Sequence, residues 1–213
     1  TKTFSPLPTS FVRSGRVSSA APPIFLLAGT DGHRRRSFLR NILRTRAAAG
    51  ARVEILSGPG AGERFEALAA TTGLLFEGEV VVVFEDPDSK KLLPILSAYS
   101  KEPNPLIDVL LLSEDDAPKG KLYDLVPPEA RKVFVLPPSY KLEEHATNFL
   151  SAESTRLGYR LDGKLAAAIV RRAGTDLGVL SYELSKATRP ADARGSRTLD
   201  VAIFRDTLAP LAE

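Results

Sequence analysis

The chain has 213 residues, of which 43% are hydrophobic and 26% are charged, a composition typical of a soluble globular protein. It contains no cysteine, which excludes disulfides and thiolate-bound metals. No apolar run approaches the roughly 20 residues that span a bilayer, so we expect a cytoplasmic protein that does not contact membranes. This length allows one or two domains.

The net charge of +3 conceals an asymmetry along the chain. Residues 1–53 hold ten Lys or Arg and a single acid, whereas the rest of the chain holds 19 basic and 25 acidic residues. A basic end of this kind can contact nucleic acid or an acidic partner. A solvated basic helix would give the same composition, so both interpretations stay open.

Residues 1–21 are rich in Ser, Pro and Thr without periodicity, which predicts a flexible N-terminal tail. Short apolar runs then alternate with helical patterns. The clearest run, Val80 to Phe84, has no polar alternation, as is typical of a strand covered on both faces. We expect strands at 24–29, 51–58, 80–84, 106–115 and 132–138, helices at 34–49, 63–73, 90–101 and 141–158, and a connector at 120–130. This alternation predicts an α/β domain over 22–158, with a mostly parallel sheet between helices.

The pattern changes after Gly158. Three helical segments follow with no strand between them, at 161–174, at 175–188 and from about Asp200 onward. A loop rich in Pro, Gly and Arg, from Arg189 to Arg197, separates the last two. We therefore predict a small all-helical domain over 159–213.

The stretch IFLLAGTDGHRRRSFL, residues 24–39, sets Gly-x-x-Gly between a strand and a helix, where a phosphate-binding loop would lie. Such a loop also needs Lys for the phosphates and Ser or Thr for Mg²⁺. Here three arginines stand in those places, and Arg does not replace a compact Lys. We predict a degenerate phosphate loop without a nucleotide cofactor, formed by Gly29, Gly32, Arg34, Arg35 and Arg36.

Glu85 and Asp86 follow the apolar strand as a Walker B pair would, in a position to hold Mg²⁺. Without a working phosphate loop, we interpret them as solvated turn residues ahead of Pro87. The sequence contains no motif for nucleophilic catalysis and no metal-ligand spacing. We predict no catalytic residue and no metal site.

Four stretches together resemble the delta subunit of bacterial DNA polymerase III, a clamp-loader subunit without ATPase activity: FLLAGTDGHRRRSFL, GLLFEGEVVVVFED, LIDVLLLSED and LGVLSYELSKAT. In the last stretch, Leu180, Glu183, Leu184 and Lys186 match a signature of the family's second domain. The resemblance covers about residues 24–213 and the family's first two domains, and we expect the third, the collar, to be absent. It implies a P-loop NTPase-like (AAA+) α/β domain followed by a small helical domain.

In that family a Leu-Phe pair at the end of a helix enters an apolar pocket on the ring-shaped sliding clamp. By this resemblance the clamp-binding residues are Leu74, Leu75 and Phe76. The role is physically reasonable, because a few buried apolar anchors can carry most of an interface's energy. Glu77 and Glu79 depart from the family, which usually has small or basic residues there. The alternative for Phe76 is a plug in the core.

The resemblance implies a non-catalytic subunit of the DNA polymerase III holoenzyme that binds and opens the sliding clamp (beta) during DNA replication. The implied partners are the other clamp-loader subunits, which hydrolyse ATP, and primer–template DNA, which passes through the assembled complex. Clustered basic charge is enough to attract phosphates, so the candidates for DNA or partner contact are Arg34, Arg35, Arg36, Arg40 and Arg44. The alternatives are a divergent AAA+-type ATPase that uses Glu85 and Asp86, and a standalone basic DNA-binding module.

Overall fold

The computed structural model describes residues 24–203 except 75–77, 86 and 88. The chain divides into two units, Thr1–Val135 and Leu136–Glu213. The predicted N-terminal tail, 1–21, lies outside the described residues.

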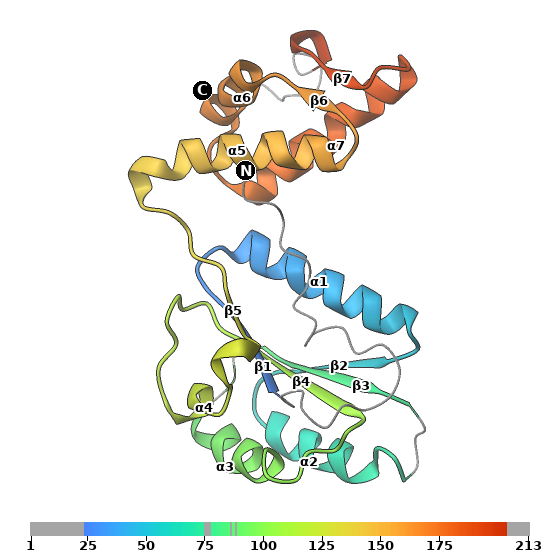
Figure 1. The fold of residues 1–213 in the computed structure, drawn as a ribbon, viewed down its shortest axis with the longest axis vertical. Helices are drawn as coiled ribbons and strands as arrows, with labels where there is room; N and C mark the ends of the chain where they lie inside the picture. Colours follow the sequence, from blue (N-terminus) through green and yellow to red (C-terminus); the bar gives the residue numbers. More distant parts are fainter. Residues whose placement is uncertain (1–23, 75–77, 86, 88, 204–213) are drawn as a thin grey trace. The chain divides into compact units, whose positions relative to one another are not determined.

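The first unit is built on a five-stranded parallel sheet with the strand order β2-β3-β4-β1-β5 (Figure 1). Its strands are β1 (Ile24–Ala28), β2 (Arg52–Leu56), β3 (Val80–Phe84), β4 (Ile107–Leu112) and β5 (Arg131–Val133). In the register, Val80 lies opposite Ile107, and Ile24 lies opposite Val109. Strands β1 and β3 are buried along their whole length, as their lack of polar alternation predicted.

Strand β5 is shorter than the predicted 132–138. Its last backbone bond to β1 runs from Phe134 N–H to Ala28 O at 2.9 Å. Pro137 and Pro138 follow soon after, and neither has an N–H to donate to a neighbouring strand.

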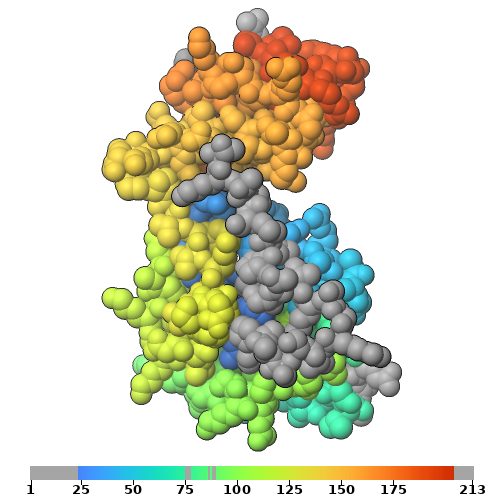
Figure 2. Space-filling model, viewed as in Figure 1, coloured from blue at the N-terminus to red at the C-terminus, as the bar shows by residue number. Residues whose placement is uncertain are grey.

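Helices cover both faces of the sheet. Helix α1 (Gly32–Ala48) lies on one face, and α2 (Ala61–Thr71) and α3 (Ser89–Tyr99) lie on the other (Figure 1). In the space-filling view, α2 and α3 form the lower surface of this unit (Figure 2). The predicted connector contains the short helix α4 (Lys121–Asp124) and a 3₁₀ turn at Pro128–Ala130.

Helices α2 and α3 approach each other closely because residue 62 has no side chain. A Cβ on Gly62 would lie only 2.4 Å from Ile95 Cδ1. Nearby, the ring of Phe65 meets Phe84 and Tyr99 nearly edge-on, with centroid separations of 5.5 and 5.1 Å. This aromatic cluster joins α2, β3 and α3 into one core beneath the sheet.

The second unit is formed by α5 (Leu142–Arg156), α6 (Gly163–Ala173) and α7 (Leu177–Ala193). The three helices share a core that includes Ala146, Leu150, Ala166, Ile169, Val170, Leu180, Leu184 and Ala187. The division between the units therefore lies between Val135 and Leu136, and not at 158 where we expected it. Our sequence interpretation assigned α5 to the α/β domain by alternation alone, but its apolar stripe is buried with α6 and α7.

The end of the second unit differs in detail from the prediction. Helix α7 continues through Pro190 to Ala193, where we expected a loop. The strands β6 (Arg160–Leu161) and β7 (Thr198–Leu199) add a two-residue parallel pair to the helical unit. Asp200 accepts a hydrogen bond from Ile203 N–H at 2.9 Å and caps the start of a further helical turn, and residues 204–213 lie outside the described residues. No helix in the described part of the chain is long and apolar enough to cross a bilayer.

Candidate functional site

The turn between β1 and α1, where we predicted a degenerate phosphate loop, contains only Gly29, Thr30 and Asp31. A phosphate loop runs for about eight residues. Gly29 has a φ of +117°, and a Cβ there would lie 2.1 Å from Phe134 O. The N–H of Asp31 donates to the same oxygen at 2.9 Å. The absence of a side chain at Gly29 thus allows close contact with the chain that follows β5. The sequence predicted that it would allow close contact with a phosphate.

Carboxylates surround the start of α1. Asp31 is 1% exposed, and its Oδ1 accepts a hydrogen bond from Arg34 N–H at 3.0 Å, so it caps the helix. Asp116 Oδ1 accepts from both Thr30 N–H at 2.8 Å and Thr30 Oγ1 at 2.9 Å. A helix N-terminus favours anions, but here these side chains already supply the negative charge and a phosphate would meet their repulsion.

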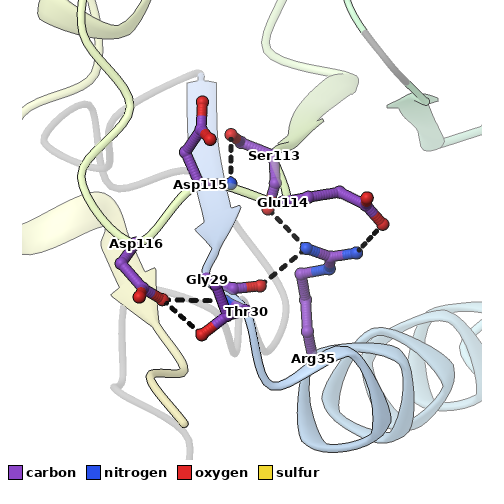
Figure 3. A network of polar contacts seen from close by, with 7 residues as sticks. All are labelled: Gly29, Thr30, Arg35, Ser113, Glu114, Asp115 and Asp116. Carbon is purple, nitrogen blue, oxygen red and sulfur yellow. Dashed lines mark hydrogen bonds and ion pairs between the residues drawn. The ribbon is translucent and has the colours of Figure 1, made fainter. Parts of the chain in front are cut away.

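Arg35 crosses from α1 to the carboxyl ends of β1 and β4 (Figure 3). Its Nη1 donates to Gly29 O at 2.7 Å and to Ser113 O at 2.6 Å, and its Nη2 donates to Glu114 Oε1 at 2.9 Å. Only 7% of Arg35 is exposed. We call this set of three hydrogen bonds the Arg35 bridge. It occupies the crevice between the carboxyl ends of the adjacent strands β1 and β4. The connections that follow these two strands lead to opposite sides of the sheet, and ligands of α/β proteins usually bind in such a crevice.

A small pocket lies beside the Arg35 bridge and encloses about 200 Å³. Ligand sites usually occupy about 300–1,000 Å³. Its lining residues are Arg35, Arg36, Leu39, Glu85, Leu112, Ser113 and Glu114. Glu85 therefore lies at the end of β3 where a Walker B acid would, and Asp86 lies outside the described residues. The short turn, the capping carboxylate and the buried guanidinium do not fit ATP with Mg²⁺. Within the described ranges, no group of three His, Cys, Asp or Glu side chains could hold a metal ion.

The five arginines predicted for DNA or partner contact separate into two groups. Arg35 is buried in the bridge and is not available to a partner. The other four, Arg34, Arg36, Arg40 and Arg44, are exposed on α1. Arg34 lies 3.9 Å from Asp31, whereas none of the described residues forms an ion pair with the remaining three.

Arg46 is a further buried arginine on α1 that sequence reasoning missed. Its Nη1 donates to Glu79 Oε2 at 3.3 Å, and its Nη2 donates to Asp108 Oδ2. This network joins the end of α1 to the amino ends of β3 and β4. It also explains Glu79, which departs from the family pattern and here serves as an intramolecular partner. A signal was present, because residues 35, 39, 42 and 46 recur at helical spacing on the buried side.

Leu74 follows directly after the end of α2. The helix ends at Thr71, and Gly73 then adopts a φ of +89° that favours glycine. Leu74 is 82% exposed, more than any other large apolar residue in the described part of the chain. The other two predicted clamp-binding residues, Leu75 and Phe76, lie outside the described residues.

The residues that match the family's second-domain signature have structural roles in α7. Leu180 and Leu184 are fully buried in the core of the second unit. Glu183 and Lys186 form an ion pair at 2.8 Å one turn apart.

No protein-family model and no curated protein sequence matches this chain. Among solved structures, the DNA clamp loader delta protein of Bacillus subtilis is similar with a TM-score of 0.59 and 13% identity, over 88% of this chain and 58% of that one. The Holliday junction branch migration motor RuvB of Thermotoga maritima matches with a TM-score of 0.45 and 11% identity, over 88% of this chain and 61% of that one. A chain in the structure of Drosophila ORC bound to DNA matches with a TM-score of 0.46 and 15% identity, over 87% of this chain and 54% of that one.

The first of these similarities shows the fold. This chain has a P-loop NTPase-like (AAA+) parallel sheet with helices on both faces, followed by a helical unit, which confirms the predicted fold class. It spans 58% of the length of the Bacillus subtilis protein.

Proposed function

We propose that this chain is a non-catalytic clamp-loader subunit that binds and opens a ring-shaped sliding clamp during DNA replication. The observation that carries the proposal is the exposure of Leu74, 82%, immediately after α2 in this fold. The contact surface comprises Leu74 together with Leu75 and Phe76, as the resemblance to the delta subunit of bacterial DNA polymerase III implies. The other partners are the remaining clamp-loader subunits.

An exposed leucine at this position has a clear energetic use. Burying a leucine side chain in a partner's pocket gains about 1.5–3 kcal/mol relative to leaving it in water. Interfaces concentrate their energy in a few such anchors. The ion pair between the buried Arg46 and the partly exposed Glu79 is consistent with this role, because it directs one acidic neighbour of the apolar residues toward α1.

The Arg35 bridge supports a role without nucleotide chemistry. Its guanidinium lies in the crevice that a phosphate would need, and Asp31 caps the helix that would bind the phosphate. These contacts disfavour the divergent AAA+-type ATPase that the sequence left open. ATP hydrolysis then belongs to other subunits of the assembly.

Helix α1 provides a second candidate surface, for primer–template DNA or a neighbouring subunit. The observation in its favour is that Arg36, Arg40 and Arg44 recur at four-residue spacing and are exposed. Like charges at this spacing repel one another and destabilise a helix by a few tenths of a kcal/mol per pair. An anionic partner removes that repulsion. The bridge excludes Arg35 from this surface.

The test is binding of the full chain to a purified sliding clamp. Replacing Leu74 by Ala should weaken binding by about thirtyfold, the effect of a typical interface anchor, and the Leu75→Ala, Phe76→Ala double variant should abolish it. Ile55→Ala is the matched control, because Ile55 is a large apolar residue that is also exposed, at 52%, on strand β2. Unchanged binding of the Leu74 and double variants, or no binding by the unsubstituted chain, would refute the proposal.

A further inference from the structure

One short turn, residues 104–106, forms hydrogen bonds both with the end of α2 and with the start of β3. On the outgoing side, Asn104 Nδ2 donates to Thr72 O at 3.0 Å and to Ala69 O at 3.4 Å. On the returning side, Val80 N–H donates to Leu106 O at 2.7 Å. The turn before β4 therefore fixes both ends of the segment that begins with Gly73 and Leu74.

Asn104 has the donors that this position requires. The last carbonyls of a helix have no partners within the helix, and the Asn104 amide supplies two N–H groups to the end of α2. Its Oδ1 accepts from Leu106 N–H at 2.9 Å, which holds the amide in place. We call these three hydrogen bonds the Asn104 clasp.

Two further contacts involve the same turn, and neither is to the Asn104 side-chain amide. The single hydroxyl proton of Tyr99 is shared between Asn104 O at 3.2 Å and Ile107 O at 3.0 Å. The backbone of Gly73 lies close to Leu106, because a Cβ added to that glycine would lie 3.5 Å from Leu106 Cδ1. Thr72 is 4% exposed, whereas Leu74, two residues later, is 82% exposed. The chain thus passes from a fixed, buried residue to a solvated leucine within two residues.

We propose that Asn104 is a positioning residue for Leu74. It orders the backbone at Thr72 before the partner arrives, so that Leu74 is presented in its binding geometry. Ordering a contact residue in advance improves affinity, since the complex no longer loses that freedom on binding. This inference rests on the proposed function, because Leu74 acts there as the contact to the clamp.

The test compares three variants of the full chain in clamp binding. Asn104→Ala removes all three clasp bonds, and Asn104→Asp keeps the acceptor for Leu106 but replaces the donors to α2 by a carboxylate that faces carbonyls. Tyr99→Phe is the matched control, since it removes the shared hydroxyl hydrogen bond from the same turn and leaves the Asn104 amide untouched. Below the melting temperature of every variant, we expect both Asn104 variants to bind the clamp about three- to tenfold more weakly, and Tyr99→Phe to bind within about twofold of the unsubstituted chain.

A second measurement reports on the clasp without a partner. The amide of Leu74 donates to Thr71 O at 3.2 Å, so its hydrogen exchange should become faster in Asn104→Ala and stay unchanged in Tyr99→Phe. Equal clamp affinity in Asn104→Ala, or an equal loss in Tyr99→Phe, would overturn the inference. If the unsubstituted chain does not bind the clamp, the proposed function fails by itself. In that case faster exchange at Leu74 upholds the clasp, and unchanged exchange overturns it.

Discussion

Replacing Arg35 by Ala tests the Arg35 bridge most directly. The change removes hydrogen bonds to the carbonyls of two buried residues, Gly29 and Ser113. Ser113 O keeps a bond from Gly29 N–H at 3.2 Å, but no other bond to Gly29 O is present among the described residues. A buried carbonyl without a partner costs about 1–3 kcal/mol, and the space left by the side chain adds to that cost. The pair with Glu114 contributes little, because that side chain is 80% exposed.

We therefore expect Arg35→Ala to lower the free energy of unfolding by about 3 kcal/mol, which corresponds to roughly 6–12 °C in melting temperature for a chain of this size. Arg36→Ala is the control, because Arg36 is the exposed neighbour and should change stability by less than about 0.5 kcal/mol. The assay is thermal and urea unfolding followed by circular dichroism.

Chemical rescue separates the bridge from general damage to the core. Guanidinium chloride at concentrations far below its denaturing range should partly restore the melting temperature of Arg35→Ala, because the ion can occupy the place of the lost group. Urea at the same concentration should not. Equal stability of the two arginine variants, or rescue by neither solute, would contradict the role we assign to the bridge.

Two further predictions concern the second unit and α1. Tyr159 Oη donates to Asp192 Oδ1 at 2.5 Å, and this bond raises the pKa of Tyr159 above its usual value of 10.0. The stability that the bond provides is complete below about pH 10 and is lost as the pH rises through the raised pKa. The stability difference between the unsubstituted chain and Tyr159→Phe should therefore shrink above about pH 10, and a constant difference in alkaline urea titrations would disprove the link. On α1, replacing Arg36, Arg40 and Arg44 by Ala should reduce the magnitude of the slope of log affinity for DNA against log salt by about 2–3. Replacing the exposed Lys101, Lys119 and Lys121 is the control and should leave a steeper slope than the arginine variant has. Equal slopes in the two triple variants would argue against a DNA surface on α1.

The strands of the sheet could be predicted from the sequence because most of them are short runs of mainly apolar residues. Val80 to Phe84 is predicted and observed with identical bounds, since five consecutive apolar residues have few alternatives to a buried strand. The end of α2 was also visible, because Gly73 supplies a positive φ that other residues resist. Local patterns of this kind specify elements but not which elements pack together, and α5 was assigned to the wrong unit for that reason.

The candidate site was harder to predict because it depends on charged residues in unusual places. Arginines are expected at the surface. Arg35 was therefore interpreted as part of a basic face, and Arg46 was not identified. Their burial depends on carbonyls and carboxylates from β4 and the turns after it, far away in sequence. No local pattern reveals those partners. Leu74 was identified through the family resemblance, and its exposure agrees with a contact role without testing it.

The three-residue turn between β1 and α1 has a consequence for how this protein can change over evolutionary time. Converting it into a nucleotide site would require a longer turn, loss of the Asp31 cap and removal of Arg35. Each step alone is costly. The first separates Gly29 from Phe134, the second leaves the start of α1 without its acceptor, and the third removes the Arg35 hydrogen bond from the buried carbonyl of Gly29. Each single change toward an ATP site would therefore pass through a less stable variant. Selection for stability alone would therefore keep the short turn, the Asp31 cap and Arg35 together.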